Sequence, residues 1–397
     1  MADKTIFHCD CNSFYASVEE TFHPQYRSVP MAIAGDPNAR HGIILAKNEL
    51  AKKYKVKTAE TVGQARKKCP SLVLCPPRHK IYGEFCERVN TVYAEYTDCV
   101  ERFGIDESFL DMSIFAGEEE KYAAELRRRI AQEIGITISV GVSWNKIFAK
   151  LGSDYKKPDA TTLITKANYK EIVFPLPVGD LFGVGKKTAE KLAEIGVRTI
   201  EQLAAVECDY LTGHFGKLGE VLYRNANGLG DDTVAKIGDG EAAKSVGNGM
   251  TFKRNLETLA EIRIGTNALA DSVAARLRRH NVKCTTVQVT IKDTSLQSIQ
   301  RQKGVSPTFL ATEIAKSAIE VIELTWKIGK PIRMLTITAS NLIPADQVIQ
   351  QLSLFETTDT AKREKQERLE QAVDRIHSKF GEKSIRRGAG NKELGIE

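Results

Sequence analysis

Hydrophobic and polar positions in the first third of the chain predict one sheet covered by helices. The apolar run Thr5–Cys9 has the character of a buried strand that leads to Asp10, and apolar residues then recur at helical spacing from Phe14 to Phe22. Four further elements are expected, in the order strand, strand, helix and strand: 100–104, 108–113, 118–134 and 136–142. The order βαββαβ predicts a ferredoxin-like sheet in a protein of the α+β class.

A long insertion separates the first helix of this unit from its second strand. Residues 24–98 are expected to form a small subdomain with strands at Met31–Ala34 and Ile43–Ala46 and a basic helix at Asn48–Tyr54. After the sheet, the stretch LFGVGKKTAEKLAEIGVRTIEQL predicts two helices, the first preceded by the turn Gly183-Val184-Gly185.

The last third of the chain shows the element order of the first third again, without a repeat of its sequence. The expected strands and helices are, in order, 244–252, 256–280, 283–292, 296–303, 307–326 and 332–340. Residues 356–397 carry ten basic and nine acidic residues, whose charges nearly cancel. We therefore expect a solvated helix or a disordered segment there rather than a segment that binds DNA.

Composition favours several folded domains with reduced cysteines. A chain of 397 residues, 42% of them hydrophobic, can bury several cores. None of the eight cysteines forms a CxxC pair, so we expect core thiols and no zinc site. Because neither a signal-peptide pattern nor an apolar run of membrane-spanning length is present, we expect a cytoplasmic protein with no membrane partner.

Positive charge is concentrated in one segment. Residues 241–345 hold 15 lysines and arginines against 8 acidic residues, whereas residues 1–240 hold 32 against 33. A local excess of positive charge is typical of nucleic-acid binding. A solvated basic face is an equally good explanation of the charge alone.

Acidic residues occur where a metal site would need them. Asp10 follows a buried strand, and the adjacent pair Asp106-Glu107 lies in a predicted hairpin. Two hard divalent cations require several carboxylate oxygens from neighbouring strands, which one sheet would bring together. For the pair alone, an ordinary acidic surface turn is the alternative.

Three stretches together resemble the Y-family, or translesion, DNA polymerases: FHCDCNSFYASVEE, FGIDESFLDMS and SVGVSWNKIFAKLGSDYKKPD. The resemblance extends from residue 5 to about residue 355. Asn12 stands where many members carry a second Asp, which brings the first motif closest to the bacterial SOS mutagenesis (polymerase V-like) branch rather than to the polymerase IV branch.

The resemblance implies a multidomain right-hand polymerase. Its parts would be a ferredoxin-like palm, a fingers insertion, a helical thumb with a helix-hairpin-helix, a second βαββαβ domain called the little finger, and a tail. In that order the expected ranges are 1–23 with 99–165, 24–98, 166–240 with the helix-hairpin-helix at 181–203, 241–345, and 346–397.

The resemblance also implies the catalytic residues. Asp10, Asp106 and Glu107 would bind two Mg²⁺ ions, with the backbone carbonyl of Cys11 as a further ligand and Mn²⁺ as an alternative ion. One ion would lower the pKa of the primer 3′-hydroxyl, and the other would neutralise the triphosphate. Asn12 leaves this ligand set intact but removes one nearby negative charge.

The expected nucleotide-binding residues are Phe14, Tyr15, Lys52 and Lys157. Tyr15 matches the position that excludes ribonucleotides, the steric gate. On a helix its ring is about 100° from the apolar stripe that contains Phe14, although core packing is the alternative. Lys52 and Lys157 match positions that contact the triphosphate, and Lys52 replaces the family's more usual Arg, so a point charge substitutes for a bidentate fork.

Contacts with DNA phosphates are expected from two regions. The first is the helix-hairpin-helix, whose turn offers backbone N–H groups to a phosphate through Gly183, Gly185, Lys186 and Lys187. The second is the basic segment, with candidates Lys253, Arg254, Arg301 and Lys303. Such contacts give affinity without sequence preference, as a polymerase requires.

Residues 351–355, QLSLF, resemble the pentapeptide that binds the bacterial sliding clamp. The contacts would come from Gln351, Leu352, Leu354 and Phe355. The alternative is that the apolar residues pack on their own domain. The other expected partners are primer-template DNA and deoxynucleoside triphosphates. The resemblance also implies a monomer that is associated with the nucleoid of a bacterium.

The function that these residues favour is DNA-directed, low-fidelity translesion synthesis without proofreading. A nucleotide cyclase is one alternative, because some cyclases place metal carboxylates on a ferredoxin-like sheet. The helix-hairpin-helix and the clamp peptide argue against it. A non-catalytic DNA-binding subunit is another alternative, and the intact Asp10, Asp106 and Glu107 argue against that.

Overall fold

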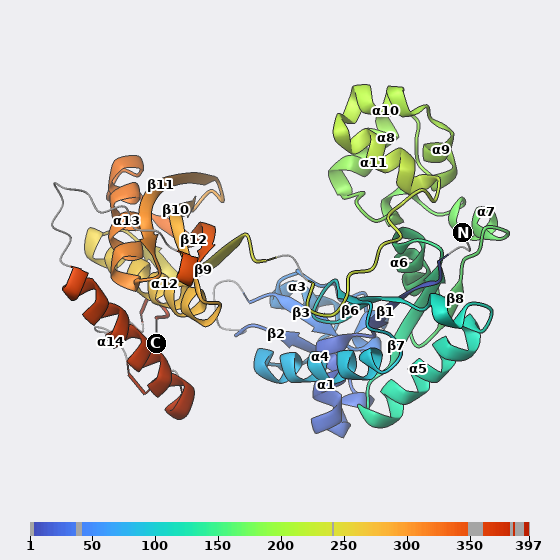
Figure 1. Ribbon diagram of the computed structural model, residues 1–397, viewed down its shortest axis with the longest axis horizontal. Coiled ribbons are helices and arrows are strands. Elements are labelled where there is room, and N and C mark those ends of the chain that lie inside the picture. The colour runs from blue at the N-terminus through green and yellow to red at the C-terminus, as the bar shows by residue number, and fades with distance from the viewer. Residues whose placement is uncertain are drawn as a thin grey trace. The chain divides into compact units, whose positions relative to one another are not determined.

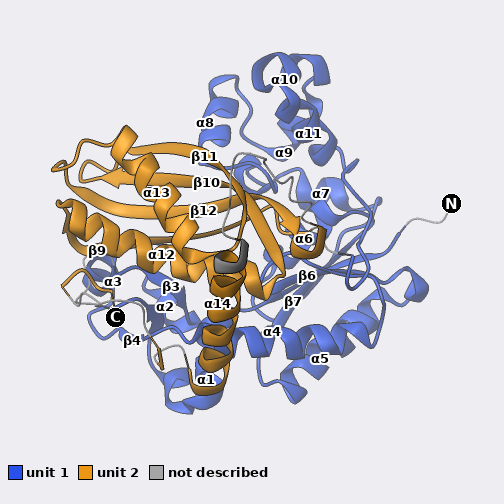
Figure 2. Cartoon of the chain, turned by 60° about the vertical axis from the view of Figure 1, so that its left-hand side comes forward, with its two compact units in different colours: residues 1–240 blue, residues 241–397 orange. Residues whose placement is uncertain are grey.

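The computed structural model describes residues 4–36, 42–239, 242–347, 360–381, 384–385 and 393–396. The chain divides into two compact units, residues 1–240 and residues 241–397, which Figure 2 shows in different colours. In the described residues no helix has both the length and the apolar character needed to cross a membrane. All eight cysteines are free thiols and six are buried, as the sequence predicts. Short 3-10 helices lie at Pro24–Ser28, Ser113–Phe115, Val178–Asp180 and Ala345–Gln347.

Five strands form the main sheet of the first unit: β1 (Ile6–Cys11), β5 (Val100–Arg102), β6 (Glu107–Asp111), β7 (Ile138–Ser143) and β8 (Thr161–Leu163). Their order in the sheet is β5-β6-β1-β7-β8. The first four are antiparallel neighbours in the ferredoxin-like order, so the expected arrangement is confirmed. Strand β8, which is too short to give a sequence pattern, pairs parallel with β7.

Strand β1 directs alternate side chains to the two faces of this sheet. Phe7 and Cys9 lie in the core beneath helices α1 (Phe14–Phe22), α4 (His79–Ala94) and α5 (Glu119–Glu133). Helix α6 (Lys146–Tyr155) lies on the opposite face (Figure 1). On that side His8 contacts Ser153 of α6, and Asp10 contacts Lys157, which follows α6. Gly141 of β7 permits this close packing, because a Cβ there would lie 1.9 Å from the backbone oxygen of Ala149 on α6.

The insertion contains a sheet of its own. Strands β2 (Met31–Ala34), β3 (Ile44–Lys47) and β4 (Val73–Cys75) take the order β3-β2-β4, and helices α2 (Glu49–Lys53) and α3 (Val62–Lys68) pack with them around a small core. The strands and the basic helix lie where the sequence predicts them. Helix α4, which also falls within 24–98, instead contributes its apolar side chains to the core of the main sheet.

A group of helices follows β8 in the first unit: α7 (Tyr169–Val173), α8 (Lys186–Glu194), α9 (Ile200–Ala205), α10 (Cys208–Phe215) and α11 (Lys217–Ala226). These helices share one hydrophobic core, and Figure 1 shows α8 to α11 gathered together. The two helices predicted to follow the glycine turn are α8 and α9. Gly183 has φ +91°, a conformation that glycine adopts without strain, and Gly185 is the N-cap residue of α8.

The second unit is built on four strands and two helices: β9 (Ser245–Leu256), α12 (Leu259–Arg279), β10 (Val282–Asp293), β11 (Ser298–Thr308), α13 (Ala311–Thr325) and β12 (Ile332–Pro344). The order βαββαβ is confirmed, but the strand order β11-β10-β12-β9 is not that of the first sheet. Here the last strand lies between the first two, whereas in the first sheet the first strand lies between the last two. The same element order therefore accompanies a different strand pairing, because periodicity predicts a strand but not its neighbour.

The tail forms helix α14 (Thr360–Phe380), which is not solvated on all sides. Glu370 is fully buried and pairs with Arg278 of α12, whose Nε also donates to Asp374 at 2.5 Å. Leu394 lies in the core of the same unit. The expected helix is present and Glu370 is the one fully buried residue described in it, so the expectation of a solvated helix is wrong only for the face that docks, where Arg278 makes the burial of a carboxylate tolerable.

Candidate active site

The three acidic residues expected to bind metal lie together where β1 ends. Asp10 and Glu107 are partners in the register of β1 and β6. The backbone N–H of Cys11 donates to the backbone oxygen of Asp106 at 2.9 Å, which holds the turn before β6 against β1. The structure thus brings Asp10, Asp106 and Glu107 to one place, as the hairpin in the sequence predicts.

Asp10 is almost completely buried beside two other acids. Burial raises the pKa of Asp10 to about 7. The Lys157 ammonium, 2.6 Å away, opposes this shift, whereas Glu107 and Asp106 add to it. Burial and the charge of Glu107 also raise the pKa of Asp106. Three carboxylates this close repel one another, and a multivalent cation would relieve that repulsion.

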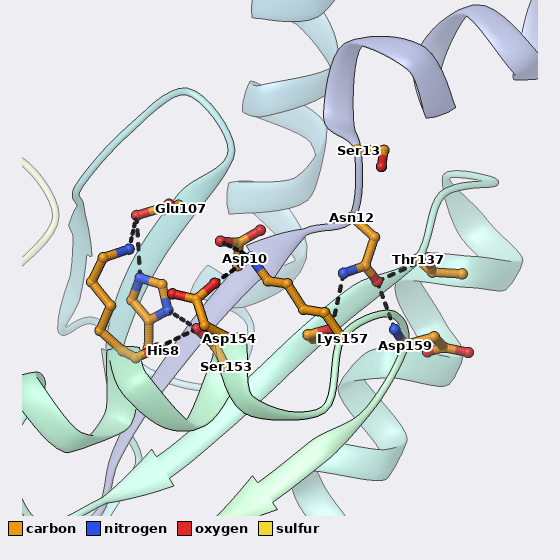
Figure 3. Close-up of polar contacts among 12 residues, drawn as sticks. His8, Asp10, Asn12, Ser13, Glu107, Thr137, Ser153, Asp154, Lys157 and Asp159 are labelled. Atoms are coloured by element: carbon orange, nitrogen blue, oxygen red, sulfur yellow. Dashed lines mark hydrogen bonds and ion pairs between the residues drawn. The ribbon is translucent and has the colours of Figure 1, made fainter. Parts of the chain in front are cut away.

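Glu107 has a different environment, which Figure 3 shows. Lys150 Nζ lies 2.6 Å from Glu107 Oε2, and His8 Nε2 lies 3.5 Å from the same oxygen. Burial alone would favour the neutral carboxyl, but the contacts with His8 and Lys150 outweigh it and lower the pKa of Glu107 to about 2. Burial lowers the pKa of His8, whose Nδ1 lies 2.7 Å from Ser153 Oγ.

Sequence reasoning missed His8, Lys150 and Ser153. A signal was available in each case. His8 precedes Asp10 by two positions and therefore shares its face of β1. Lys150 and Ser153 are three residues apart and so lie on one face of α6. These spacings do not predict a function for the three residues, because the sequence does not show that α6 packs against β1.

The donor chemistry of the three acids fits a divalent cation, because Mg²⁺ and Mn²⁺ prefer carboxylate oxygens. Among the described residues, however, no three His, Cys, Asp or Glu side chains converge in a way that could hold a metal ion. The ion pairs give the reason. Lys157 holds Asp10 and Lys150 holds Glu107, so the two carboxylates are drawn toward different ammonium groups. A bound cation would compete with both lysines.

The two aromatic residues at the start of α1 differ in their availability to a nucleotide. The Tyr15 ring stacks on Tyr82 with centroids 4.2 Å apart, but it is only half-buried. Burial and the charge of Asp106 raise the pKa of the Tyr15 hydroxyl, so this hydroxyl lies within electrostatic reach of the acidic residues. The side chain of Phe14 lies in the core, so the expected contact of this residue with a nucleotide would have to come from its backbone.

The two residues expected to contact the triphosphate lie on different elements, and Lys157 is the one that contacts an acid of the site. Lys157 follows α6 and pairs with Asp10 and, at 2.7 Å, with Asp154. Burial alone would lower the pKa of Lys157, but these carboxylates outweigh it and raise that pKa. Lys52 lies on α2 and pairs at 2.5 Å with Glu49, which also accepts a 3.0 Å hydrogen bond from Ser13 beside α1.

The residues expected to contact DNA phosphates differ in their exposure and in how closely their side chains are paired with acidic residues. Lys186 and Lys187 are exposed in the first turn of α8, where Lys186 lies 3.8 Å from Glu190, and Arg301 is exposed on β11. Arg254 and Lys303 instead pair with Glu261 and Glu320 at 2.5 and 2.6 Å. The backbone N–H of Lys253 donates to Leu394. The clamp-binding peptide expected at 351–355 lies outside the described residues.

The chain is similar to known DNA polymerases along nearly all of its length. Residues 9–154 match the model of the impB/mucB/samB family, and residues 243–354 match the model of its C-terminal domain. Residues 179–230 match the thumb domain of DNA polymerase-iota. DNA polymerase IV of Acetivibrio thermocellus is 45% identical over 397 residues, which cover 99% of each chain. The chain belongs to the Y-family of translesion DNA polymerases.

This Y-family polymerase is a DNA-directed DNA polymerase, and dependence on divalent metal is general to its family. DNA polymerase IV 1 of Bacillus subtilis is 36% identical, over 98% of this chain and 94% of its own. A solved Y-family DNA polymerase chimera has the same fold, with a TM-score of 0.77 at 22% identity over 85% of this chain and 99% of its own. Because these two full-length relatives are named DNA polymerase IV, the expected closeness to the polymerase V-like branch, which rested on Asn12, is not supported.

Proposed function

We propose that this Y-family polymerase carries out low-fidelity translesion synthesis by two-metal-ion nucleotidyl transfer, without proofreading. Primer-template DNA and deoxynucleoside triphosphates would be its substrates, and pyrophosphate its second product. The observation that carries the proposal is the meeting of Asp10, Asp106 and Glu107 at the adjoining ends of β1 and β6, with the Lys157 ammonium 2.6 Å from Asp10.

The residues around the three acids would bind the metal ions and the triphosphate and would exclude ribonucleotides. When bound, two Mg²⁺ ions, or Mn²⁺ in their place, would lower the pKa of the primer 3′-hydroxyl and offset the charge of the triphosphate. The three carboxylates and the carbonyl of Cys11 would hold them. Lys157 and Lys52 would bind the triphosphate, and the half-buried ring of Tyr15 would exclude a ribose 2′-hydroxyl.

The elements can be assigned to the parts of a right hand. The main sheet would be the palm, the three-stranded insertion the fingers, helices α7 to α11 the thumb and the second unit the little finger. In the described part of the chain, the last helix, α14, belongs to the second unit, where Asp374 accepts a hydrogen bond from Arg278 of α12. No described element is then left to form an exonuclease domain, which supports synthesis without proofreading.

Primer extension tests this proposal. We expect Mg²⁺-dependent addition of deoxynucleotides opposite undamaged and abasic template positions, and no removal of a mispaired 3′ terminus. A nucleotide cyclase would instead convert a nucleoside triphosphate without a primer, and a non-catalytic subunit would bind DNA and extend nothing. Either of those two results would refute the proposal.

We also propose that a monomer of this polymerase binds the bacterial sliding clamp through residues 351–355. The support is the QLSLF sequence that follows β12. Deletion of the five residues should remove stimulation by the clamp and leave clamp-independent extension unchanged. Equal loss of both activities would contradict this assignment.

A further inference from the structure

The loop between α6 and β8 runs alongside the end of β1 and carries Lys157. Lys157 lies over Asp10, and two residues later the backbone N–H of Asp159 donates to Asn12 Oδ1 at 2.8 Å. Asp10 and Asn12 are also two residues apart, so they lie on the same side of an extended chain. The loop and β1 therefore meet at two points with matching spacing (Figure 3).

Asn12 is built into the sheet as a fixed acceptor. It is 4% exposed, and its Oδ1 also accepts a hydrogen bond of 3.0 Å from Thr137 Oγ1. Its Nδ2 donates to Ser139 Oγ at 2.8 Å, and its backbone N–H donates to the Thr137 oxygen at 2.9 Å. Because a backbone N–H is always a donor, the Asp159 contact also fixes which way the amide points.

Arg127 of α5 holds the same loop from another side. Its Nε and Nη2 donate to Asp159 Oδ1 at 3.0 and 2.9 Å. Asp159 has φ +48°, a left-handed conformation that is uncommon for a residue with a side chain and persists when its surroundings hold it. Asn12 and Arg127 together supply that restraint on the residue two positions after Lys157.

We infer that Asn12 is a positioning residue for Lys157: by anchoring the backbone of Asp159, it fixes where the Lys157 ammonium meets the triphosphate. The inference rests on the proposed function. A lysine side chain has considerable rotamer freedom, so an anchored backbone reduces what must be ordered when the nucleotide binds. A neutral amide serves here because a carboxylate at position 12 would be a further competitor for the Lys157 charge, which Asp10 and Asp154 already hold.

A double-mutant cycle tests the inference in the full chain. Asn12→Ala leaves the Asp159 N–H without its acceptor and should weaken deoxynucleotide binding roughly tenfold, with little change in the maximal rate of incorporation. Binding is measured on a dideoxy-terminated primer, where no chemistry occurs, and the rate by single-turnover extension. In a Lys157→Ala background, Asn12→Ala should have no further effect on binding.

Two arginine variants provide a second route and its control. Arg127→Ala should resemble Asn12→Ala, and it carries the test if Asn12→Ala fails to fold. Arg128→Ala should leave binding unchanged, because Arg128 is exposed and its side chain bonds to Gln132 on its own helix. Independent, multiplicative effects of Asn12→Ala and Lys157→Ala would overturn the inference alone. A wild-type chain that extends no primer would overturn the proposed function and the inference with it.

Discussion

Asp10 and Glu107 are opposite each other on the adjacent strands β1 and β6, yet their surroundings shift the two pKa values in opposite directions. Burial and neighbouring carboxylates raise the pKa of Asp10, whereas Lys150 and His8 lower that of Glu107 in spite of burial. Each acid therefore has its own ammonium partner, at 2.6 Å in both cases. A divalent cation that binds here has to replace two short ion pairs, so its affinity depends on these lysines as well as on the acids.

Tyr15 gives the sharpest prediction for one side chain. Tyr15→Ala should raise ribonucleotide incorporation relative to deoxynucleotide incorporation at least about tenfold, because the ring that stacks on Tyr82 no longer occupies the space of a 2′-hydroxyl. Tyr15→Phe keeps the ring and should keep the discrimination. The ratio of incorporation efficiencies measures the effect, and an unchanged ratio in Tyr15→Ala would exclude Tyr15 as the gate.

The individual residues that could be predicted are those whose motif is local. Asp10, Asp106-Glu107 and Tyr15 are recognisable from their immediate neighbours in the sequence. The contacts of His8 with Ser153 and of Asn12 with Asp159 each join residues more than one hundred positions apart. A single sequence holds no record of such contacts, so the supporting network around the acids becomes visible only in the fold.

Helix α12 shows how one element depends on its first turn. Thr258 and Glu261 form a capping box, in which each side chain accepts a hydrogen bond from the other residue's backbone N–H. Arg254 adds an ion pair to Glu261. Burial alone would raise the pKa of Glu261, but the backbone N–H groups of Glu257 and Thr258 and the charge of Arg254 lower it to about 2.

Glu261→Ala should lower the stability of the second unit by about 1 kcal/mol at pH 7, the usual contribution of a helix cap. Because the folded pKa lies below the ordinary value of 4.5, the charge-dependent part is present above about pH 4.5 and is lost as the pH falls toward 2. Glu261→Gln keeps the acceptor oxygen and should lose only that part. Urea unfolding followed by Trp326 fluorescence in a Trp144→Phe background measures this unit, and an equal destabilisation by Glu261→Gln at pH 7 and pH 2 would contradict the charge argument.

Most elements could be predicted, because each has a clear periodicity of apolar residues. Both βαββαβ orders and the helices around Gly183 lie close to their expected ranges. The pairing of β12 with both β9 and β10 could not be predicted, because an apolar strand fits any interior position of a sheet equally well. Strand β8 was missed because three residues are too few to show a period.

At the scale of the whole molecule, each unit contains both sheet and helix, and the tail belongs to the second unit. A nearly neutral, highly charged sequence predicts solvent exposure for residues 360–380, yet Glu370 is fully buried against Arg278. Composition fails here because it counts charges without showing which of them are paired. The basic excess of 241–345 is likewise partly offset by acidic residues of the tail, since Arg278 pairs with Glu370 and Lys283 pairs with Glu367.

The middle of α14 should show slow amide hydrogen exchange in the intact protein. Arg278→Met removes the charged group that pairs with the buried Glu370, a loss of about 3–5 kcal/mol for a buried ion pair, so exchange in α14 should accelerate while α12 stays protected. Arg279→Met changes the exposed neighbouring arginine and should alter neither helix. Fast exchange throughout α14 in the wild type would show that the helix is not docked.

The role of the three carboxylates is tested most directly by single-turnover nucleotide incorporation with Asp10→Asn in Mg²⁺. We expect a loss of at least about 1,000-fold in rate with primer-template binding preserved, because the substitution removes the charge of a proposed metal ligand and leaves the shape of the side chain. Asp111→Asn, in the same sheet but bonded to Ser113, should remain within about threefold of the wild type. Incorporation by Asp10→Asn at the rate of the Asp111→Asn control would contradict the central claim.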